Sequence, residues 1–249
     1  MATDTRVALV TGGTRGLGLA VTQRLADAGV QVAAAYARDD AAAEALRGRS
    51  ERCGVAVSLH RADVADPAAC GALVAEVLGR HGRLDYLINN AGMVVEQRLA
   101  EITTADWQRQ VAVNLSAAFF LTQAAVESMS QRRFGRVVNI GSVSAVMGNP
   151  VQVAYAAAKA GLVGLTRSAA RAVARKGITV NCVIPGSFET DLAEALTYTD
   201  RDRVTSMIPV GRWGRPPELA HAVSALLADD AAYITGAVLT VDGGMSIGG

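Results

Sequence analysis

Short apolar runs, many of them β-branched, alternate with amphipathic runs rich in alanine and leucine along the whole chain. The apolar runs predict strands near 6–11, 31–36, 55–60, 84–89, 136–141, 178–184 and 237–241. The amphipathic runs predict helices near 16–28, 40–52, 66–80, 103–130, 153–175 and 216–227. This alternation indicates βαβ units, and therefore an α/β fold with a doubly wound (Rossmann) parallel sheet and helices on both faces.

The chain shows no repeat, low-complexity tract or Pro/Gly/Ser-rich linker that would divide its 249 residues. We therefore expect one catalytic domain spanning 1–249. The longest interruption is 185–215, a polar stretch between the sixth strand and the last helix. It is longer than an ordinary connection, and its place at the strand ends predicts a substrate lid at about 186–215.

Charge and composition exclude several classes of function. The net charge is +1, with 24 basic and 23 acidic residues mixed along the chain, which disfavours nucleic acid and acidic membranes as partners. The three cysteines lie far apart and fit neither a disulfide framework nor a zinc site, so we expect reduced thiols and no metal. No secretory signal or apolar run of membrane-spanning length is evident, so we expect a cytoplasmic protein.

The segment TGGTRGLG at 11–18 follows a predicted strand and opens a predicted helix, the context of a phosphate-binding turn. Gly12 permits the tight turn, Gly16 lets the backbone approach a pyrophosphate, and Gly18 lets helix and strand pack closely. The helix N-terminus then faces the phosphates. The cofactor-binding residues predicted in this turn are Gly12, Thr14, Arg15, Gly16, Leu17 and Gly18.

The end of the second strand bears on the choice of cofactor. An NAD site would be expected to place an acidic residue there to bind the ribose 2′-hydroxyl, but the chain has Tyr36. Arg15 and Arg38 offer two guanidiniums to a 2′-phosphate, which favours NADP(H). Asp39 and Asp40 argue mildly for NAD, although capping of the next helix is their plainer role.

Further along the chain, two predicted strand ends offer nucleotide contacts. Asp63, followed by Val64, could accept from an adenine amino group or could cap a helix. The small residues of NNAG at 89–92 would let a cofactor lie across the strand ends, and they add Asn90, Ala91 and Gly92 to the predicted binding residues.

The candidate chemistry lies in Ser142, Tyr155 and Lys159. Tyr155 and Lys159 are four residues apart in a predicted helix and share one face. A nearby ammonium favours phenolate and is expected to lower the tyrosine pKa from about 10 toward the working range of an acid catalyst. Ser142 could then hold the carbonyl that Tyr155 protonates, although Ser144 also carries a hydroxyl.

Asn114 is a polar residue within an apolar predicted helix. Two roles are open to its side chain. It could make a structural hydrogen bond to a neighbouring carbonyl, or it could anchor a water between Lys159 and solvent.

The order and spacing of TGGTRGLG, NNAG, Asn114, Ser142, Y-x-x-x-K and the PG at 185–186 resemble the short-chain dehydrogenase/reductase family over nearly the whole chain. Within that family, segments such as NIGSVSAVMGN and PVGRWGRPPELA are most similar to 3-oxoacyl-[acyl-carrier-protein] reductases. The resemblance implies an NADPH-dependent ketoreductase and a homotetramer.

The resemblance also implies roles for particular residues. Tyr155 donates the proton, Ser142 orients the carbonyl, Lys159 lowers the tyrosine pKa and holds the nicotinamide ribose, and Asn114 supports a water relay. Residues implied to border the nicotinamide are Pro185, Gly186, Phe188 and Thr190. Arg133 and Lys176 match the positions where such reductases dock an acidic acyl-carrier protein near the site mouth, although both are also ordinary charges at helix ends.

Three functions follow from these observations. The first is reduction of a β-ketoacyl thioester carried by a carrier protein or coenzyme A. The second is reduction of a small ketone, a sugar or a polyketide. The third is a nucleotide-sensing regulator that has lost catalysis, which would be expected to lack one of Ser142, Tyr155 or Lys159, whereas all three are present.

Overall fold

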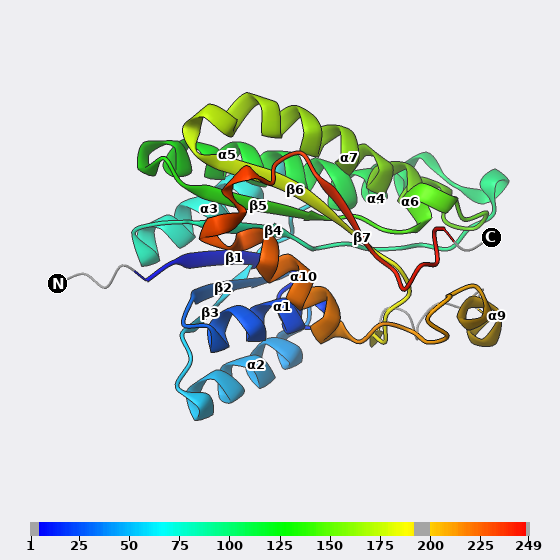
Figure 1. Ribbon diagram of the computed structural model, residues 1–249, viewed down its shortest axis with the longest axis horizontal. Helices are drawn as coiled ribbons and strands as arrows, with labels where there is room; N and C mark the ends of the chain where they lie inside the picture. The colour runs from blue at the N-terminus through cyan, green and yellow to red at the C-terminus, as the bar shows by residue number, and fades with distance from the viewer. Residues whose placement is uncertain (1–4, 192–199, 248–249) are drawn as a thin grey trace.

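A computed structural model describes residues 5–191 and 200–247 of the chain. All seven strands found in this part form one parallel sheet with the order β3-β2-β1-β4-β5-β6-β7 (Figure 1). The predicted doubly wound sheet is confirmed. The strands are β1 (Val7–Thr11), β2 (Gln31–Tyr36), β3 (Val57–Arg61), β4 (Tyr86–Asn89), β5 (Gly135–Ile140), β6 (Ile178–Pro185) and β7 (Val238–Val241).

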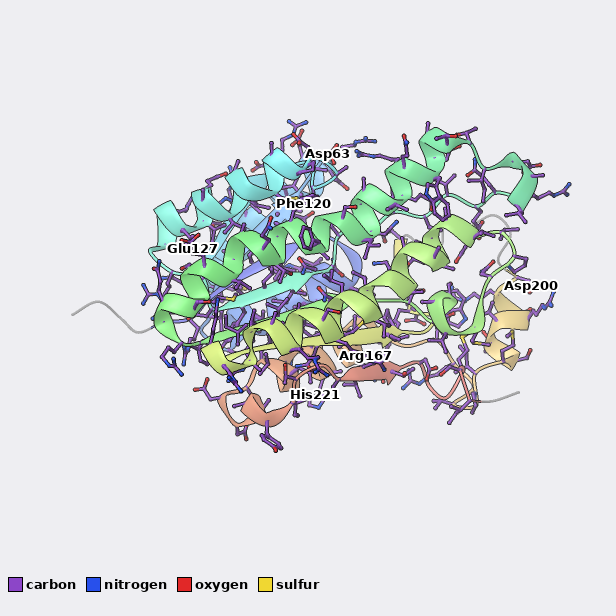
Figure 2. The ribbon with its side chains drawn as sticks, turned by 90° about the horizontal axis from the view of Figure 1, so that it is seen from above. Asp63, Phe120, Glu127, Arg167, Asp200 and His221 are labelled. Atoms are coloured by element: carbon purple, nitrogen blue, oxygen red, sulfur yellow. The ribbon has the colours of Figure 1, made fainter. Side chains whose placement is uncertain are left out.

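Helices cover both faces of this sheet. On one face α3 (Pro67–His81), α5 (Ala117–Arg132) and α7 (Val153–Val173) lie side by side, as Figure 2 shows. On the other face lie α1 (Gly16–Asp27), α2 (Asp40–Cys53) and α10 (Pro216–Leu227). The two faces of β1 contribute to two separate hydrophobic cores. Val7 and Leu9 pack with α3 and α5, whereas Ala8 and Val10 pack with α1 and α10.

Local sequence explains where several helices begin and end. The Asp39 and Asp66 carboxylates accept from the backbone N–H groups of Ala42 and Ala68 and cap α2 and α3. Pro67 occupies the first turn of α3, and Gly54 and Gly82 adopt left-handed conformations just after α2 and α3. The capping role expected for Asp39 is confirmed.

The predicted helix at 103–130 is interrupted. It consists of α4 (Thr104–Val111), a π-helical turn (Ala112–Ser116) and α5, and Asn114 lies inside the π turn. A π turn inserts one extra residue into the helical repeat, and such turns often occur at functional sites. Apolar periodicity does not reveal this insertion, because it changes the repeat by one residue only.

The run Thr104–Arg132 is long and apolar enough to cross a membrane by length and composition alone. Its side chains Leu121, Ala125 and Met129 are buried in the core shared with α3 and the sheet. This burial is what a core helix of an α/β protein requires.

The long polar stretch 185–215 contains helix α9 (Arg201–Ser206), which the sequence analysis did not predict. Part of the predicted lid, 192–199, lies outside the described residues. Three further short helices in the described residues were not predicted, since they are too brief to show periodicity: Leu99–Glu101, α6 (Ser144–Met147) and Asp229–Tyr233.

Candidate active site

The glycine turn joins β1 to α1 at the carboxyl edge of the sheet. Gly12 and Gly16 have φ values of 63° and 53°, a region that glycine enters without a steric penalty. A Cβ on Gly18 would overlap the carbonyl oxygen of Gly12, so helix and turn can pack this closely only with glycine there. Around the turn, Thr14 is buried, Leu17 is partly buried and Arg15 is exposed.

Asn90 fastens this turn to the end of β4. Its side-chain amide donates to the carbonyl oxygens of Thr11 at 2.8 Å and Gly12 at 3.2 Å. The backbone N–H groups of Asn90 and Ala91 donate to the Thr11 hydroxyl at 3.1 and 3.0 Å. Asn90 and Ala91 therefore hold the glycine turn in a fixed shape, so the phosphate cradle is already formed by the chain itself.

Tyr36, at the end of β2, is half-buried and lies beside two acidic residues of the following turn. Burial and a hydrogen bond to Asp40 raise the pKa of Tyr36. Asp39 caps α2 and also lies 4.0 Å from the Arg15 guanidinium, while Arg38 is exposed. Asp39 is therefore already engaged, and both Arg15 and Arg38 present exposed cations at this strand end.

Asp63 does not cap α3, because that role belongs to Asp66. Instead its carboxylate accepts from the Arg109 guanidinium at 2.9 Å and from the backbone N–H of Ala65. Burial works to raise the pKa of Asp63, but the Ala65 and Arg109 hydrogen bonds outweigh it and the pKa is lowered. Val64 is buried in the core beside α3.

Ser142 follows β5, and Tyr155 lies in the first turn of α7. Burial raises the pKa of Tyr155, and a hydrogen bond from Ser142 acts in the opposite direction. The Ser144 hydroxyl donates to Gln152 at 2.9 Å, and Gln152 in turn donates to Glu96 at 3.2 Å. Ser142, rather than Ser144, is therefore the hydroxyl that faces Tyr155.

Lys159 is buried, and its ammonium donates to the carbonyl oxygen of Ile140 at 2.8 Å. The ammonium lies 5.7 Å from the centre of the Tyr155 ring. Burial lowers the pKa of Lys159 to about 8. We expected Lys159 to lower the pKa of Tyr155, but that pKa is raised. Burial of the phenol dominates, and the Lys159 ammonium is directed at the Ile140 carbonyl oxygen.

Asn114 makes structural hydrogen bonds. Its amide donates to the carbonyl oxygens of Met93 at 2.8 Å and Gln110 at 2.9 Å, and its oxygen accepts from the Met93 N–H. A Cβ on Gly92 would lie 3.0 Å from the Asn114 oxygen and 3.5 Å from the Lys159 nitrogen. Gly92 therefore separates the two polar side chains.

The segment after β6 turns back over the glycine turn. A Cβ on Gly186 would strike Asp242 at 2.7 Å, and a Cβ on Gly16 would lie 3.7 Å from the Thr190 methyl group. Phe188 is 5% exposed and packs in the core with α10. Pro185 ends β6, Gly186 follows it, and Thr190 lies beside Gly16.

Arg133 and Lys176 precede β5 and β6, whereas Ser142 and Pro185 stand at the other ends of these strands. A six-residue strand such as β5 spans about 20 Å. The expectation that these two cations lie near the mouth of the same chain's site was therefore wrong. Two residues that the sequence analysis missed, Gln152 and Arg109, act through contacts between distant elements that no local pattern encodes.

No group of three or more His, Cys, Asp or Glu residues that could hold a metal occurs in the described ranges. The three cysteines are free, with Cys70 and Cys182 buried and Cys53 exposed. Burial raises the pKa of Cys70 and of Cys182 to about 11, which leaves both as unreactive thiols.

The fold and this edge of the sheet define a dinucleotide-binding α/β protein. The glycine turn and the N-terminus of α1 lie at the carboxyl ends of the strands, together with Ser142, Tyr155 and Lys159. A family model described as enoyl-(acyl carrier protein) reductase matches residues 12–246. The chain belongs to the short-chain dehydrogenase/reductase family and is an oxidoreductase that uses a nicotinamide cofactor.

Several relatives are similar over almost their whole length. The 3-oxoacyl-[acyl-carrier-protein] reductase FabG of Escherichia coli (strain K12) is 41% identical over 240 residues, which cover 96% of this chain and 97% of that protein. Nodulation protein G of Azospirillum brasilense is 39% identical, covering 97% and 98%. A solved mutant of a Serratia marcescens short-chain dehydrogenase/reductase matches with a TM-score of 0.90 and 37% identity, covering 97% and 98%.

Proposed function

We propose that this protein reduces a 3-oxoacyl thioester, carried by an acyl-carrier protein or coenzyme A, to the 3-hydroxyacyl thioester with NADPH. The similarity to 3-oxoacyl-[acyl-carrier-protein] reductases over nearly the full chain supports this substrate class. The observation that carries the proposal is the placement of Tyr155 and the buried Lys159 one turn apart in α7, with the ammonium 5.7 Å from the Tyr155 ring and Ser142 just after β5.

Each residue has a defined task in this reaction. A bound nicotinamide would supply the hydride for the C3 carbonyl carbon, and the Tyr155 hydroxyl would donate its proton to the carbonyl oxygen. Burial keeps Tyr155 protonated at neutral pH, as a proton donor must be, and the Ser142 hydrogen bond favours the phenolate that remains. Lys159 would hold the nicotinamide ribose, and with Asn114 it would return a proton to Tyr155 through water.

NADPH is proposed over NADH because the end of β2 carries Tyr36 instead of a carboxylate, and Arg15 and Arg38 are exposed there. A 2′-phosphate would form charge-assisted hydrogen bonds with these guanidiniums. Replacing Arg38 with alanine should lower kcat/KM for NADPH about tenfold and change that for NADH about twofold or less. Equal or faster turnover of wild-type enzyme with NADH would overturn the cofactor assignment.

We propose one domain over 1–249 with a substrate lid at about 186–215, a cytoplasmic location and a homotetramer. Carrier docking at Arg133 and Lys176 is proposed only for an oligomer in which this end of the chain lies beside a partner's site, because its own site is at the opposite edge of the sheet. Charge reversal of both residues should raise KM for a carrier-bound substrate several-fold and leave KM for the coenzyme A thioester unchanged.

The direct test is a substrate panel with NADPH, in which oxidation is followed by absorbance. Acetoacetyl-CoA and a 3-oxoacyl carrier protein represent the proposed substrates, a small free ketone represents the alternative, and crotonyl-CoA tests the reaction in the family model's description. The highest kcat/KM is expected for a 3-oxoacyl thioester. A higher value for the small ketone or for crotonyl-CoA would replace the proposal, and no turnover of any of them would favour a nucleotide-sensing regulator.

A further inference from the structure

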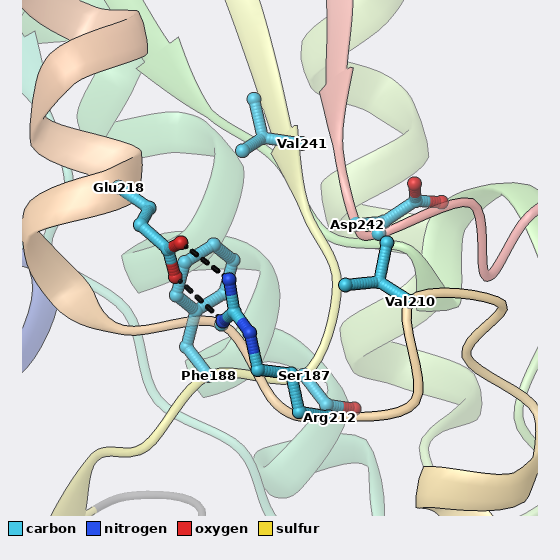
Figure 3. A pocket seen from close by; sticks show the side chains of 9 residues that line it. Ser187, Phe188, Val210, Arg212, Glu218, Val241 and Asp242 are labelled. Carbon is cyan, nitrogen blue, oxygen red and sulfur yellow. Dashed lines mark hydrogen bonds and ion pairs between the residues drawn. The ribbon is translucent and has the colours of Figure 1, made fainter.

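Glu218, in the first turn of α10, holds two arginines of the preceding loop. The Arg212 guanidinium donates to both carboxylate oxygens, at 2.6 and 2.9 Å, as the dashed lines in Figure 3 show. The backbone N–H of Arg215 donates to the same carboxylate at 2.7 Å. These bonds, that of Arg212 first, lower the pKa of Glu218 to about 2, so the carboxylate is charged throughout the neutral range.

Gly214, between the two arginines, is bonded to the segment 187–190. Its N–H donates to the Ser187 carbonyl at 2.9 Å, and its carbonyl accepts from the Glu189 N–H at 3.0 Å, which makes a parallel bridge. A Cβ on Gly214 would lie 2.6 Å from the Phe188 ring. The position of the loop therefore fixes the position of 187–190.

Segment 187–190 lies over the glycine turn, because the Thr190 methyl group stands beside Gly16. Trp213, next to Gly214, donates from its indole to the Thr205 hydroxyl of α9 at 3.0 Å, and the Arg201 guanidinium stacks on its ring at 4.8 Å. Loop residues 212–215 thus connect α10, α9 and segment 187–190, which borders the glycine turn.

A pocket lies beside this connection. Ser187, Phe188, Arg212 and Glu218 line a pocket of about 220 Å³ together with Val210 and Asp242 (Figure 3). The Glu218 carboxylate and its bonds therefore add a polar link between α10 and the segment to the packing of Phe188 against α10.

We propose that Glu218 is a positioning residue for the reductase site, which acts by clamping Arg212 so that 187–190 stays seated over the glycine turn and the cofactor. This inference rests on the proposed function, in which Pro185, Gly186 and Thr190 border the nicotinamide. It assigns to Glu218 a role in cofactor and substrate affinity, although the residue lies outside the catalytic group.

The test uses two variants that reach the clamp from opposite sides, Glu218→Gln and Arg212→Met. Glutamine retains an oxygen for the Arg215 N–H, so the start of α10 is preserved while the charged fork is lost. Asp229→Ala is the matched control, because it removes an exposed carboxylate beyond the other end of α10 that pairs with Arg6. Melting temperatures establish that each variant is folded.

Both clamp variants are expected to weaken NADPH binding, measured by nucleotide fluorescence, and to raise KM for acetoacetyl-CoA by about fivefold, with kcat reduced less. The double variant should be no worse than either single variant, because both remove one interaction. Folded variants with affinities within about twofold of wild type would overturn the inference. If wild-type protein binds nucleotide but does not reduce thioesters, only the proposed function fails, since the binding measurement still tests the clamp.

Discussion

Lys159 and Ile140 are joined by a 2.8 Å hydrogen bond from the ammonium to the backbone carbonyl at the end of β5. Lys159 lies one turn after Tyr155 in α7, and Ile140 lies two residues before Ser142. The bond therefore ties the helix that carries the phenol to the strand that positions the serine. The candidate catalytic group is a single unit whose geometry is set by a buried cation.

Deprotonation of Lys159 at high pH is predicted to change activity and stability in opposite directions. Burial lowers the pKa of Lys159 to about 8, so kcat/KM should fall about tenfold per pH unit above roughly pH 8, where the ammonium is lost. The folded-state pKa lies below the unfolded value, so this group's contribution to stability should increase as pH rises from about 8 toward 10.5. Rate profiles from pH 6 to 10, with unfolding measured at each pH, test both signs. A flat rate profile up to pH 10 would contradict the assignment.

Ser142 and Ser144 form a matched pair for mutation. Ser142→Ala removes the hydroxyl bonded to Tyr155 and should lower kcat by about 10²-fold. Ser144→Ala removes a hydroxyl bonded to Gln152 and should change kcat only a few-fold. Steady-state kinetics with acetoacetyl-CoA measure kcat of both variants. Equal losses of kcat would show that Ser142 has no special role in the reaction.

Tyr155→Phe isolates the proton donor. Deleting the phenolic hydroxyl should lower kcat by about 10³-fold, within the range for loss of a general acid. NADPH affinity should stay within a few-fold of wild type, since the glycine turn and Asn90 are untouched. Single-turnover kinetics and nucleotide binding separate the two effects, and retained activity would remove Tyr155 from this role.

The sequence predicts the glycine turn and the sheet well because both depend on local rules. Gly12 and Gly16 need positive φ, and apolar periodicity marks buried strands whatever their partners. By contrast, the burial that raises the Tyr155 pKa, and the Asp63–Arg109 pair, arise between elements far apart in the chain. The prediction that Arg133 and Lys176 lie near the mouth of the chain's own site failed for the same reason. A motif match does not say at which end of a strand a residue lies.

Gly18 and Gly79 give a second matched pair. Gly18→Ala forces a Cβ onto the Gly12 carbonyl and should cost about 1–3 kcal/mol of stability and reduce NADPH affinity at least tenfold. Gly79, inside α3, has open space around its Cα, so Gly79→Ala should stabilise by about 0.5–1 kcal/mol without affecting binding. Urea unfolding and nucleotide titration measure these changes. A tolerated Gly18→Ala would refute the close packing of turn and helix.

His81, at the end of α3, predicts a loss of stability in mild acid. Its ring bonds to Ser58 at 2.9 Å and Gln31 at 3.3 Å, and the ring of His60, itself bonded to Glu76, lies 6.4 Å away. Burial, Arg80 and His60 lower the pKa of His81 below 6.5.

Because the unfolded chain binds this proton first, the contribution of His81 to stability is present above about pH 6.5 and is lost as pH falls toward its folded-state pKa. Urea unfolding at pH 5.5 and 7.5 should show a smaller difference in His81→Gln than in wild type. His221→Gln, which alters an exposed histidine on α10, is the control and should retain the wild-type difference. If His81→Gln leaves the pH dependence of unfolding unchanged, the acid sensitivity arises elsewhere in the chain.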